Sequence, residues 1–110
     1  MQAVIVSEDL FSIGNHRAVA AATVKHRLPS AFAYRAFVEE GGLFSYGPSL
    51  EERLRHLGRY AGRILRGTPA ADLPVDRPTQ FQLVINMKTA KLMGLTIPPL
   101  LLAQAEELIE

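Results

Sequence analysis

Short apolar runs that alternate with helical stretches constrain the fold of this 110-residue chain more than any other feature. Residues 3–6 form a continuous apolar run of the kind found in strands that are covered on both faces. Three such strand candidates each precede a helical pattern: the strands at 3–6, 31–34 and 43–46, and the helices at 15–26, 36–40 and 50–66. Because three strand–helix units in succession favour right-handed crossovers, the expected fold class is α/β, with a largely parallel sheet and flanking helices.

The best-defined element is the helix expected after Pro48. Ser49 and Glu52 have the spacing of a capping box, in which each side chain satisfies a free backbone amide at the helix start. Apolar residues at spacings of four, three, four and three form one stripe along this helix: Leu50, Leu54, Leu57, Ala61 and Ile64. Gly67 and then Pro69 end the helix. The stripe predicts a helix that buries one face against a partner.

The C-terminal third predicts one more strand and two short helices. Residues 80–86 alternate between polar and apolar side chains, which indicates a half-buried or edge strand with Phe81, Leu83 and Ile85 on one face. Asn86 is expected to cap a short helix that Gly94 ends. A last helix is expected to begin at residues 98–99 and to continue to the end of the chain, with five apolar side chains inward: Leu101, Leu102, Ala105, Leu108 and Ile109.

Composition and charge exclude several classes of function. The chain has no cysteine, so it holds no disulfide, thiol nucleophile or thiolate metal site. A formal net charge of +1 gives no overall field that would attract nucleic acid or an anionic membrane. The long helix carries a basic stripe, which we interpret as a solvated face because acidic residues precede it: Arg55, Arg59, Arg63 and Arg66.

The sequence contains no recognisable catalytic constellation. His16, His26 and His56 lack the spacing of metal ligands. Ser45 does not lie in the motif of a nucleophile elbow. We therefore expect no enzyme activity, no metal and no cofactor. The first residues lack the basic region of a signal peptide, and no stretch is long enough to span a bilayer, so either the chain is cytosolic or an N-terminal portion has been removed.

Polar residues follow each of the three strands that are expected to be parallel. Ligands of open α/β sheets bind beyond the carboxyl ends of the strands. Here these ends carry carboxylates, a guanidinium, hydroxyls and aromatic rings: Ser7, Glu8, Asp9, Tyr34, Arg35, Ser45 and Tyr46. A ligand carboxylate would pair with Arg35, and an amine with Glu8 or Asp9. An aromatic ring would stack on Tyr34 or Tyr46.

Two other interpretations of these strand ends stay open. Strand ends are polar in any fold of this class, so the residues are also compatible with solvated turns. Alternatively, Glu8 or Asp9 acts as the base of an enzyme. Adjacent residues at a strand end usually point apart, which argues against one site that uses both carboxylates.

Several separated segments closely resemble ABC-transporter substrate-binding proteins of the tryptophan/tyrosine type. They occur in the same order along nearly the whole chain: EEGGLFSYGPSL at 39–50, ILRGTPAADLPV at 64–75, PTQFQLVINMKTAK at 78–91 and LTIPP at 95–99. The resemblance implies a type I periplasmic-binding fold, in which two α/β lobes close on a solute. Since members of this family are about three times longer, the chain would be the C-terminal part, with residues 1–42 in one lobe, 43–67 crossing to the other, and 68–110 forming the returning strand and terminal helices.

The resemblance also implies a location, partners and a site. The full-length form would be periplasmic or extracytoplasmic and would deliver a small polar or aromatic, amino-acid-like solute to a membrane permease. By position, Ser7, Glu8 and Asp9 match one contact loop, Tyr34 a second, and Ser45 with Tyr46 a region near the hinge. Half a cleft leaves apolar surface exposed, so we expect the isolated chain to self-associate. The alternative is a stand-alone α/β domain that senses a ligand or mediates an interaction.

Overall fold

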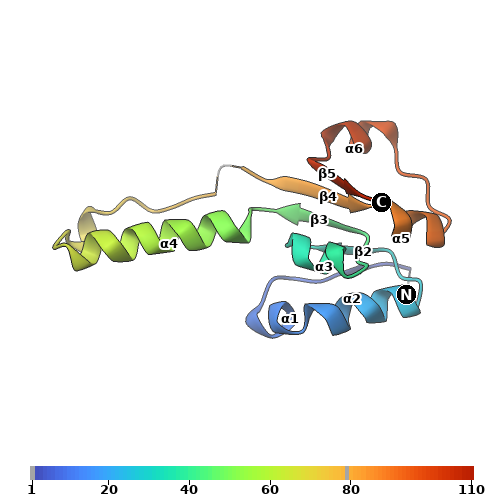
Figure 1. The fold of residues 1–110 in the computed structure, drawn as a ribbon, viewed down its shortest axis with the longest axis horizontal. Coiled ribbons are helices and arrows are strands. Elements are labelled where there is room, and N and C mark those ends of the chain that lie inside the picture. Colours follow the sequence, from blue (N-terminus) through green and yellow to red (C-terminus); the bar gives the residue numbers. More distant parts are fainter. Residues whose placement is uncertain (1, 79) are drawn as a thin grey trace.

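Five short strands form a single sheet in the order β1-β2-β3-β4-β5 (Figure 1). The computed structural model describes residues 2–78 and 80–110. The strands are β1 (Val4–Ile5), β2 (Ser30–Phe32), β3 (Phe44–Gly47), β4 (Gln82–Asn86) and β5 (Glu107–Ile109). β1, β2 and β3 run parallel, β4 is antiparallel to β3, and β5 is parallel to β4. The largely parallel α/β sheet expected from the sequence is confirmed.

Six α-helices and one 3₁₀ turn connect the strands. They are α1 (Leu10–Gly14), α2 (His16–Lys25), α3 (Arg35–Glu39), α4 (Leu50–Leu65), the turn η1 (Ala70–Asp72), α5 (Met87–Leu92) and α6 (Pro99–Gln104). α3 packs against β2, β3 and β4, and α2 packs against α3. Figure 1 shows α1, α2 and α3 together beside the first strands, whereas α5 and α6 accompany the last two.

The core lies between α3 and the parallel strands. The rings of Phe32 and Phe37 stack with their centroids 4.6 Å apart and an interplanar angle of 12°, and Tyr34 joins them. Val6, which directly follows β1, packs on this cluster together with Ile13 of α1 and Leu50 of α4. The core therefore fixes α3 at the carboxyl ends of β2 and β3, where the candidate site residues lie.

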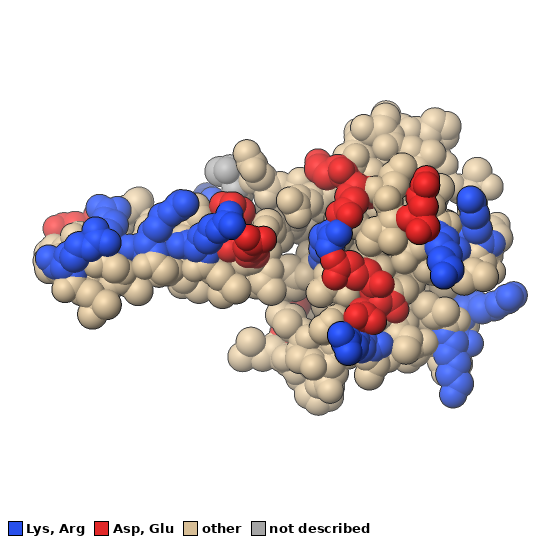
Figure 2. All heavy atoms as spheres, viewed as in Figure 1, with Lys and Arg blue, Asp and Glu red and all other residues tan. Residues whose placement is uncertain are grey.

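Helix α4 leaves the sheet and carries its apolar stripe into solvent. In Figure 1 it forms an arm together with the segment that returns to β4, and basic side chains line this arm in Figure 2. The Tyr60 hydroxyl donates to the Pro74 carbonyl at 2.7 Å, which ties the returning segment to α4. Leu54 and Leu57 are 58% and 64% exposed, so the predicted stripe exists, but beyond Leu50 it remains largely uncovered within residues 2–78 and 80–110.

Two helix caps were predicted from the sequence; the capping box at Ser49 is confirmed in part, and the cap at Asn86 is confirmed in full. Ser49 caps α4, since its hydroxyl accepts from the Glu52 amide at 3.3 Å. The Glu52 carboxylate does not return the bond as a complete capping box requires; it accepts from Arg55 at 3.0 Å. Asn86 caps α5 through a 3.0 Å bond from the Thr89 amide.

The end of the chain differs from the sequence prediction. The last helix ends at Gln104, and β5 replaces the expected final turns. The Glu106 amide donates to the Leu83 carbonyl at 3.0 Å, and the Leu83 amide donates to the Glu106 carboxylate at 2.5 Å. The open edge of β4 carries unpaired backbone groups, and satisfying them overrides the local helical pattern of residues 105–109.

Two further expectations were wrong or incomplete. β4 was expected to bury one face, but adjacent Val84 and Ile85 are both 2% exposed, because this end of the strand is covered on both faces. Helix α1 was not predicted. It has five residues, too few for an apolar period to be recognised, and it begins where the Asp9 carboxylate accepts from the Ser12 amide at 2.7 Å.

Candidate functional site

The carboxyl ends of β1, β2 and β3 lie at one edge of the sheet because the three strands are parallel. A cavity of about 170 Å³ opens at this edge beside β2 and β3. Its lining comes from the start of α3, the end of β3 and the start of α4, and includes Tyr34, Ser45, Gly47, Leu50 and Gln82. Segments that are far apart in the sequence therefore meet in one concave surface.

Glu8 and Tyr34 form the polar pair at this edge. The Tyr34 hydroxyl donates to the Glu8 carboxylate at 2.8 Å, across 26 positions of sequence. Tyr34 is only 9% exposed, and burial followed by the hydrogen bond to Glu8 raises its pKa. The phenol therefore keeps its proton and remains a donor, while the exposed Glu8 carboxylate retains free acceptor positions for an amine.

Asp9 and Ser7 contribute less than the sequence predicted. The two oxygens of Asp9 accept from the amide and the hydroxyl of Ser12, at 2.7 and 2.9 Å. These hydrogen bonds lower the pKa of Asp9, so the carboxylate is ionised and committed to the start of α1. Ser7 is exposed beside Glu8, and its side chain makes no hydrogen bond within the described chain. Of the loop 7–9, Glu8 is the residue that reaches Tyr34.

Ser45 and Tyr46 lie on opposite faces of the sheet, as consecutive strand residues do. Ser45 is 2% exposed and pairs in register with Phe32 of β2, on the face that carries the Tyr34 cavity. Tyr46 is 61% exposed and stacks on Phe81, with ring centroids 5.7 Å apart. The structure thus brings Ser45 to Tyr34 and leaves Tyr46 on the other side of the ribbon formed by β3 and β4.

Gly47 allows β3 to pass close to the end of β2. A Cβ atom at this position would lie 2.4 Å from the carbonyl oxygen of Ala33. Any side chain would therefore force the two strand ends apart. The glycine brings the last residue of β3 against β2 immediately before the chain leaves the sheet through Pro48 and Ser49.

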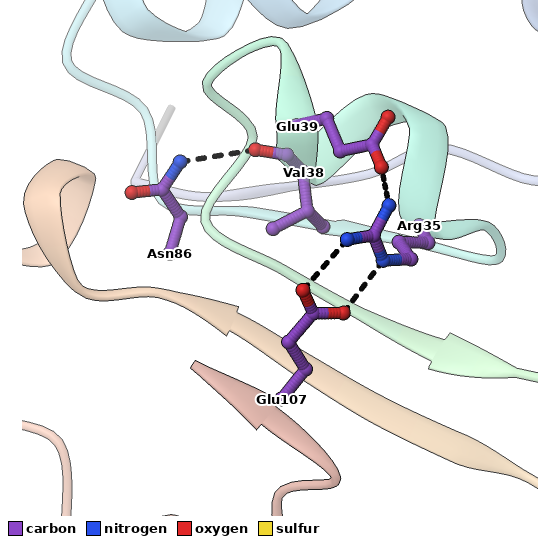
Figure 3. Close-up of polar contacts among 5 residues, drawn as sticks. All are labelled: Arg35, Val38, Glu39, Asn86 and Glu107. Carbon is purple, nitrogen blue, oxygen red and sulfur yellow. Dashed lines mark hydrogen bonds and ion pairs between the residues drawn. The ribbon is translucent and has the colours of Figure 1, made fainter. Parts of the chain in front are cut away.

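Arg35 borders the cavity, but its guanidinium is already occupied by two carboxylates (Figure 3). Its Nε and one terminal nitrogen donate to the two oxygens of Glu107, each at 2.6 Å, and its other terminal nitrogen pairs with Glu39. The hydrogen bond from Arg35 lowers the pKa of Glu107. The predicted pairing of Arg35 with a ligand carboxylate is thus disfavoured, because Arg35 joins α3 to β5 instead.

Arg53 is a charged residue near the site that the sequence analysis did not select. It lies one turn into α4, lines a second cavity beside the first, and its positive charge lowers the pKa of Tyr34, opposing burial and the Glu8 bond. Within the described residues Arg53 makes no ion pair. Its spacing of four residues from the cap Ser49 was the available signal, since i and i+4 lie on one helix face.

A match to a known protein family shows to which family the chain belongs. Residues 1–109 match the family described as ABC transporter substrate binding protein. The chain belongs to this family. The resemblance inferred from the sequence is therefore confirmed. A comparison with curated proteins gives no match.

Solved structures show how much of a substrate-binding protein the chain contains. It is similar to the ABC domain in complex with L-Trp from Streptococcus pneumoniae (TM-score 0.88, 28% identity), covering 99% of this chain and 37% of that one. It is also similar to a conserved domain protein from Vibrio cholerae O1 biovar El Tor strain N16961 (TM-score 0.87, 25% identity), covering 97% of this chain and 36% of that one. The chain thus spans little more than a third of these structures.

A third solved structure shares the fold. It is a ligand-free, open substrate-binding protein with adhesive properties from Clostridium difficile, with a TM-score of 0.59 and 22% identity over 96% of this chain and 35% of that one.

Neither a membrane-spanning helix nor a metal site is found in the part of the present chain that the structure describes. None of its helices there is long and apolar enough to cross a membrane. Nor do three potential metal ligands gather at any point among residues 2–78 and 80–110.

Proposed function

We propose that the chain is the C-terminal portion of a two-lobed solute-binding protein, and that the carboxyl ends of β1, β2 and β3 form one wall of its cleft. The observation that carries this proposal is the Glu8–Tyr34 pair at the edge of a cavity that Ser45 also lines. A buried phenol that donates to an exposed carboxylate is a preorganised polar group at the position where ligands of such sheets bind.

The geometry of α4 supports an incomplete two-lobed fold. The chain leaves the sheet after Gly47, and returns to it at Gln82 beside the same strand. Between these points α4 presents Leu54 and Leu57 to solvent, although its stripe has the pattern of a face that packs on a core. A second lobe that covers the stripe would use β3 and β4 as two of the connections between lobes, with residues 1–42 in the first lobe. In this assignment the solute lies between α4 and the start of α3.

The chemistry of the wall favours an amino-acid-like solute. The Glu8 carboxylate suits an ammonium group, and the half-enclosed surface beside Tyr34 suits an apolar or aromatic side chain. The Streptococcus pneumoniae relative was solved with L-Trp, which makes L-tryptophan the first solute to test. In the full-length form, closure of the lobes would retain the solute for delivery to a membrane permease, outside the cytoplasm and without any covalent step.

The test is a thermal-shift screen of amino acids and small carboxylates against the full-length form. A solute at one hundred times its dissociation constant stabilises the folded protein by about 2.7 kcal/mol, so the shift is easily measured. Glu8→Gln should abolish the shift produced by the best amino acid. Glu40→Gln is the matched control, since Glu40 lies at the other end of α3 and pairs with Arg17. The absence of a shift with every solute contradicts the proposal.

A further inference from the structure

A second cavity of about 300 Å³ lies between the first turns of α4 and the segment that returns to β4. Ser49, Glu52, Arg53 and His56 line it from α4, and Asp76 and Arg77 line it from the returning segment. Glu52 and Arg53 each lie three or four residues from both Ser49 and His56, so the four positions share one side of the helix. Ionisable side chains of both signs therefore line the cavity, with an arginine on each side.

The charges around this cavity leave Arg53 available for an anion. The carboxylates of Glu51 and Glu52 both pair with Arg55, at 2.5 and 3.0 Å. Asp76 faces His56, with 3.5 Å between its carboxylate and the ring nitrogen. No acidic group among the described residues lies within ion-pair distance of Arg53. An unpaired guanidinium at the rim of a cavity offers two parallel N–H groups to a carboxylate.

The two cavities adjoin at the point where the chain leaves the sheet. Pro48, Ser49 and Gln82 line both of them, one cavity containing Arg53 and the other Tyr34. The guanidinium of Arg53 is near enough to the phenol of Tyr34 for its positive charge to lower the pKa of that group, against the larger opposing effects of burial and Glu8. A solute at this junction would meet the Glu8–Tyr34 pair on one side and Arg53 on the other.

We propose that Arg53 pairs with a carboxylate of the solute, so that the cleft selects solutes that carry both a carboxylate and an amine. The inference rests on the proposed function and adds the residue that would determine this selectivity. Pairing with a ligand carboxylate was expected of Arg35 from the sequence. Arg53 has this role instead, because the three guanidinium nitrogens of Arg35 already pair with Glu39 and Glu107 (Figure 3). The α4 N-terminus adds a favourable dipole for the same anion.

The experiment compares two ligands that differ only in the carboxylate. Isothermal titration calorimetry on the full-length form uses L-tryptophan and tryptamine, and then any amino acid that gives a larger thermal shift, together with its decarboxylated amine. Arg53→Gln removes the charge, and Arg53→Lys retains it without the paired N–H groups. Arg59→Gln is the control, since Arg59 is an exposed arginine of the same helix that lines neither cavity.

The wild-type protein should bind the amino acid more tightly than the amine. Arg53→Gln should weaken binding of the amino acid by about 10- to 100-fold and leave binding of the amine unchanged, Arg53→Lys should lie between, and Arg59→Gln should match the wild type. Melting curves without ligand show whether each variant is folded. Two results would overturn the role of Arg53 but leave the proposed function intact. One is a wild type that binds the amino acid and the amine with equal affinity. The other is an Arg53→Gln variant that binds the amino acid as tightly as the wild type does. A wild type that binds no amino acid overturns both.

Discussion

Gly47 offers a quantitative test of how closely β2 and β3 meet at the candidate site. In Gly47→Ala the new Cβ atom would lie 2.4 Å from the carbonyl oxygen of Ala33, whereas ordinary contacts begin at 3.4 Å. The atom is thus about 1 Å too close to a backbone group, which cannot rotate away as a side chain can. The strand ends must separate, and overpacking of this kind costs about 1–3 kcal/mol, with a backbone clash near the upper end.

Urea unfolding followed by circular dichroism measures this cost. With a denaturant dependence of about 1–3 kcal/mol per molar, the midpoint of Gly47→Ala should fall by about 1–2 M. Gly58→Ala is the matched control: apart from the adjacent residues and the nearby backbone of α4 itself, no heavy atom lies within 4 Å of its new Cβ, so alanine in the interior of α4 should stabilise the helix by about 0.5–1 kcal/mol. All variants are compared at one protein concentration, because association shifts the midpoint. A midpoint for Gly47→Ala equal to that of the wild type would refute the proposed close approach.

Three further predictions concern the frame around the site. Asn86→Ala removes the cap of α5 and a buried 3.0 Å bond to the Val38 carbonyl, so the free energy of unfolding in urea should fall by about 2–4 kcal/mol. Because Arg35 lowers the pKa of Glu107, this pair stabilises the fold above the ordinary carboxyl pKa of 4.5, and its contribution is lost as the pH falls through the lower folded pKa. In a plot of melting temperature against pH, the curve of Glu107→Gln should therefore be flatter than that of the wild type below pH 4.5. The isolated chain should self-associate through α4, and Leu54→Glu with Leu57→Glu should make it monomeric in sedimentation velocity; a wild-type monomer would contradict this.

Features set by neighbouring residues were accessible from the sequence. The three strand–helix units, the cap at Ser49 and the cap at Asn86 depend on interactions within a few positions, so their patterns are visible locally. The parallel order of β1, β2 and β3 followed from the alternation of strands and helices, and with it the position of Glu8 and Tyr34 at one edge of the sheet.

Features set by distant partners were not accessible. β5 forms because the edge of β4 needs backbone partners, and no property of residues 107–109 alone distinguishes a strand from the last turn of a helix. Arg35 meets Glu107 across 72 positions, so its guanidinium looked available in the sequence. Arg53 was not selected from the sequence, because its proximity to Tyr34 depends on how α4 leaves β3.

The central claim is that the solute lies against the carboxyl ends of β1, β2 and β3. The most direct measurement is a crystal structure of the full-length form with the amino acid that stabilises it most. The account predicts that the ammonium group lies within about 2.6–3.2 Å of the Glu8 carboxylate or the Tyr34 hydroxyl, in a cleft that α4 helps to close. A solute bound elsewhere, with Glu8 and Tyr34 in contact only with each other and with water, would contradict it.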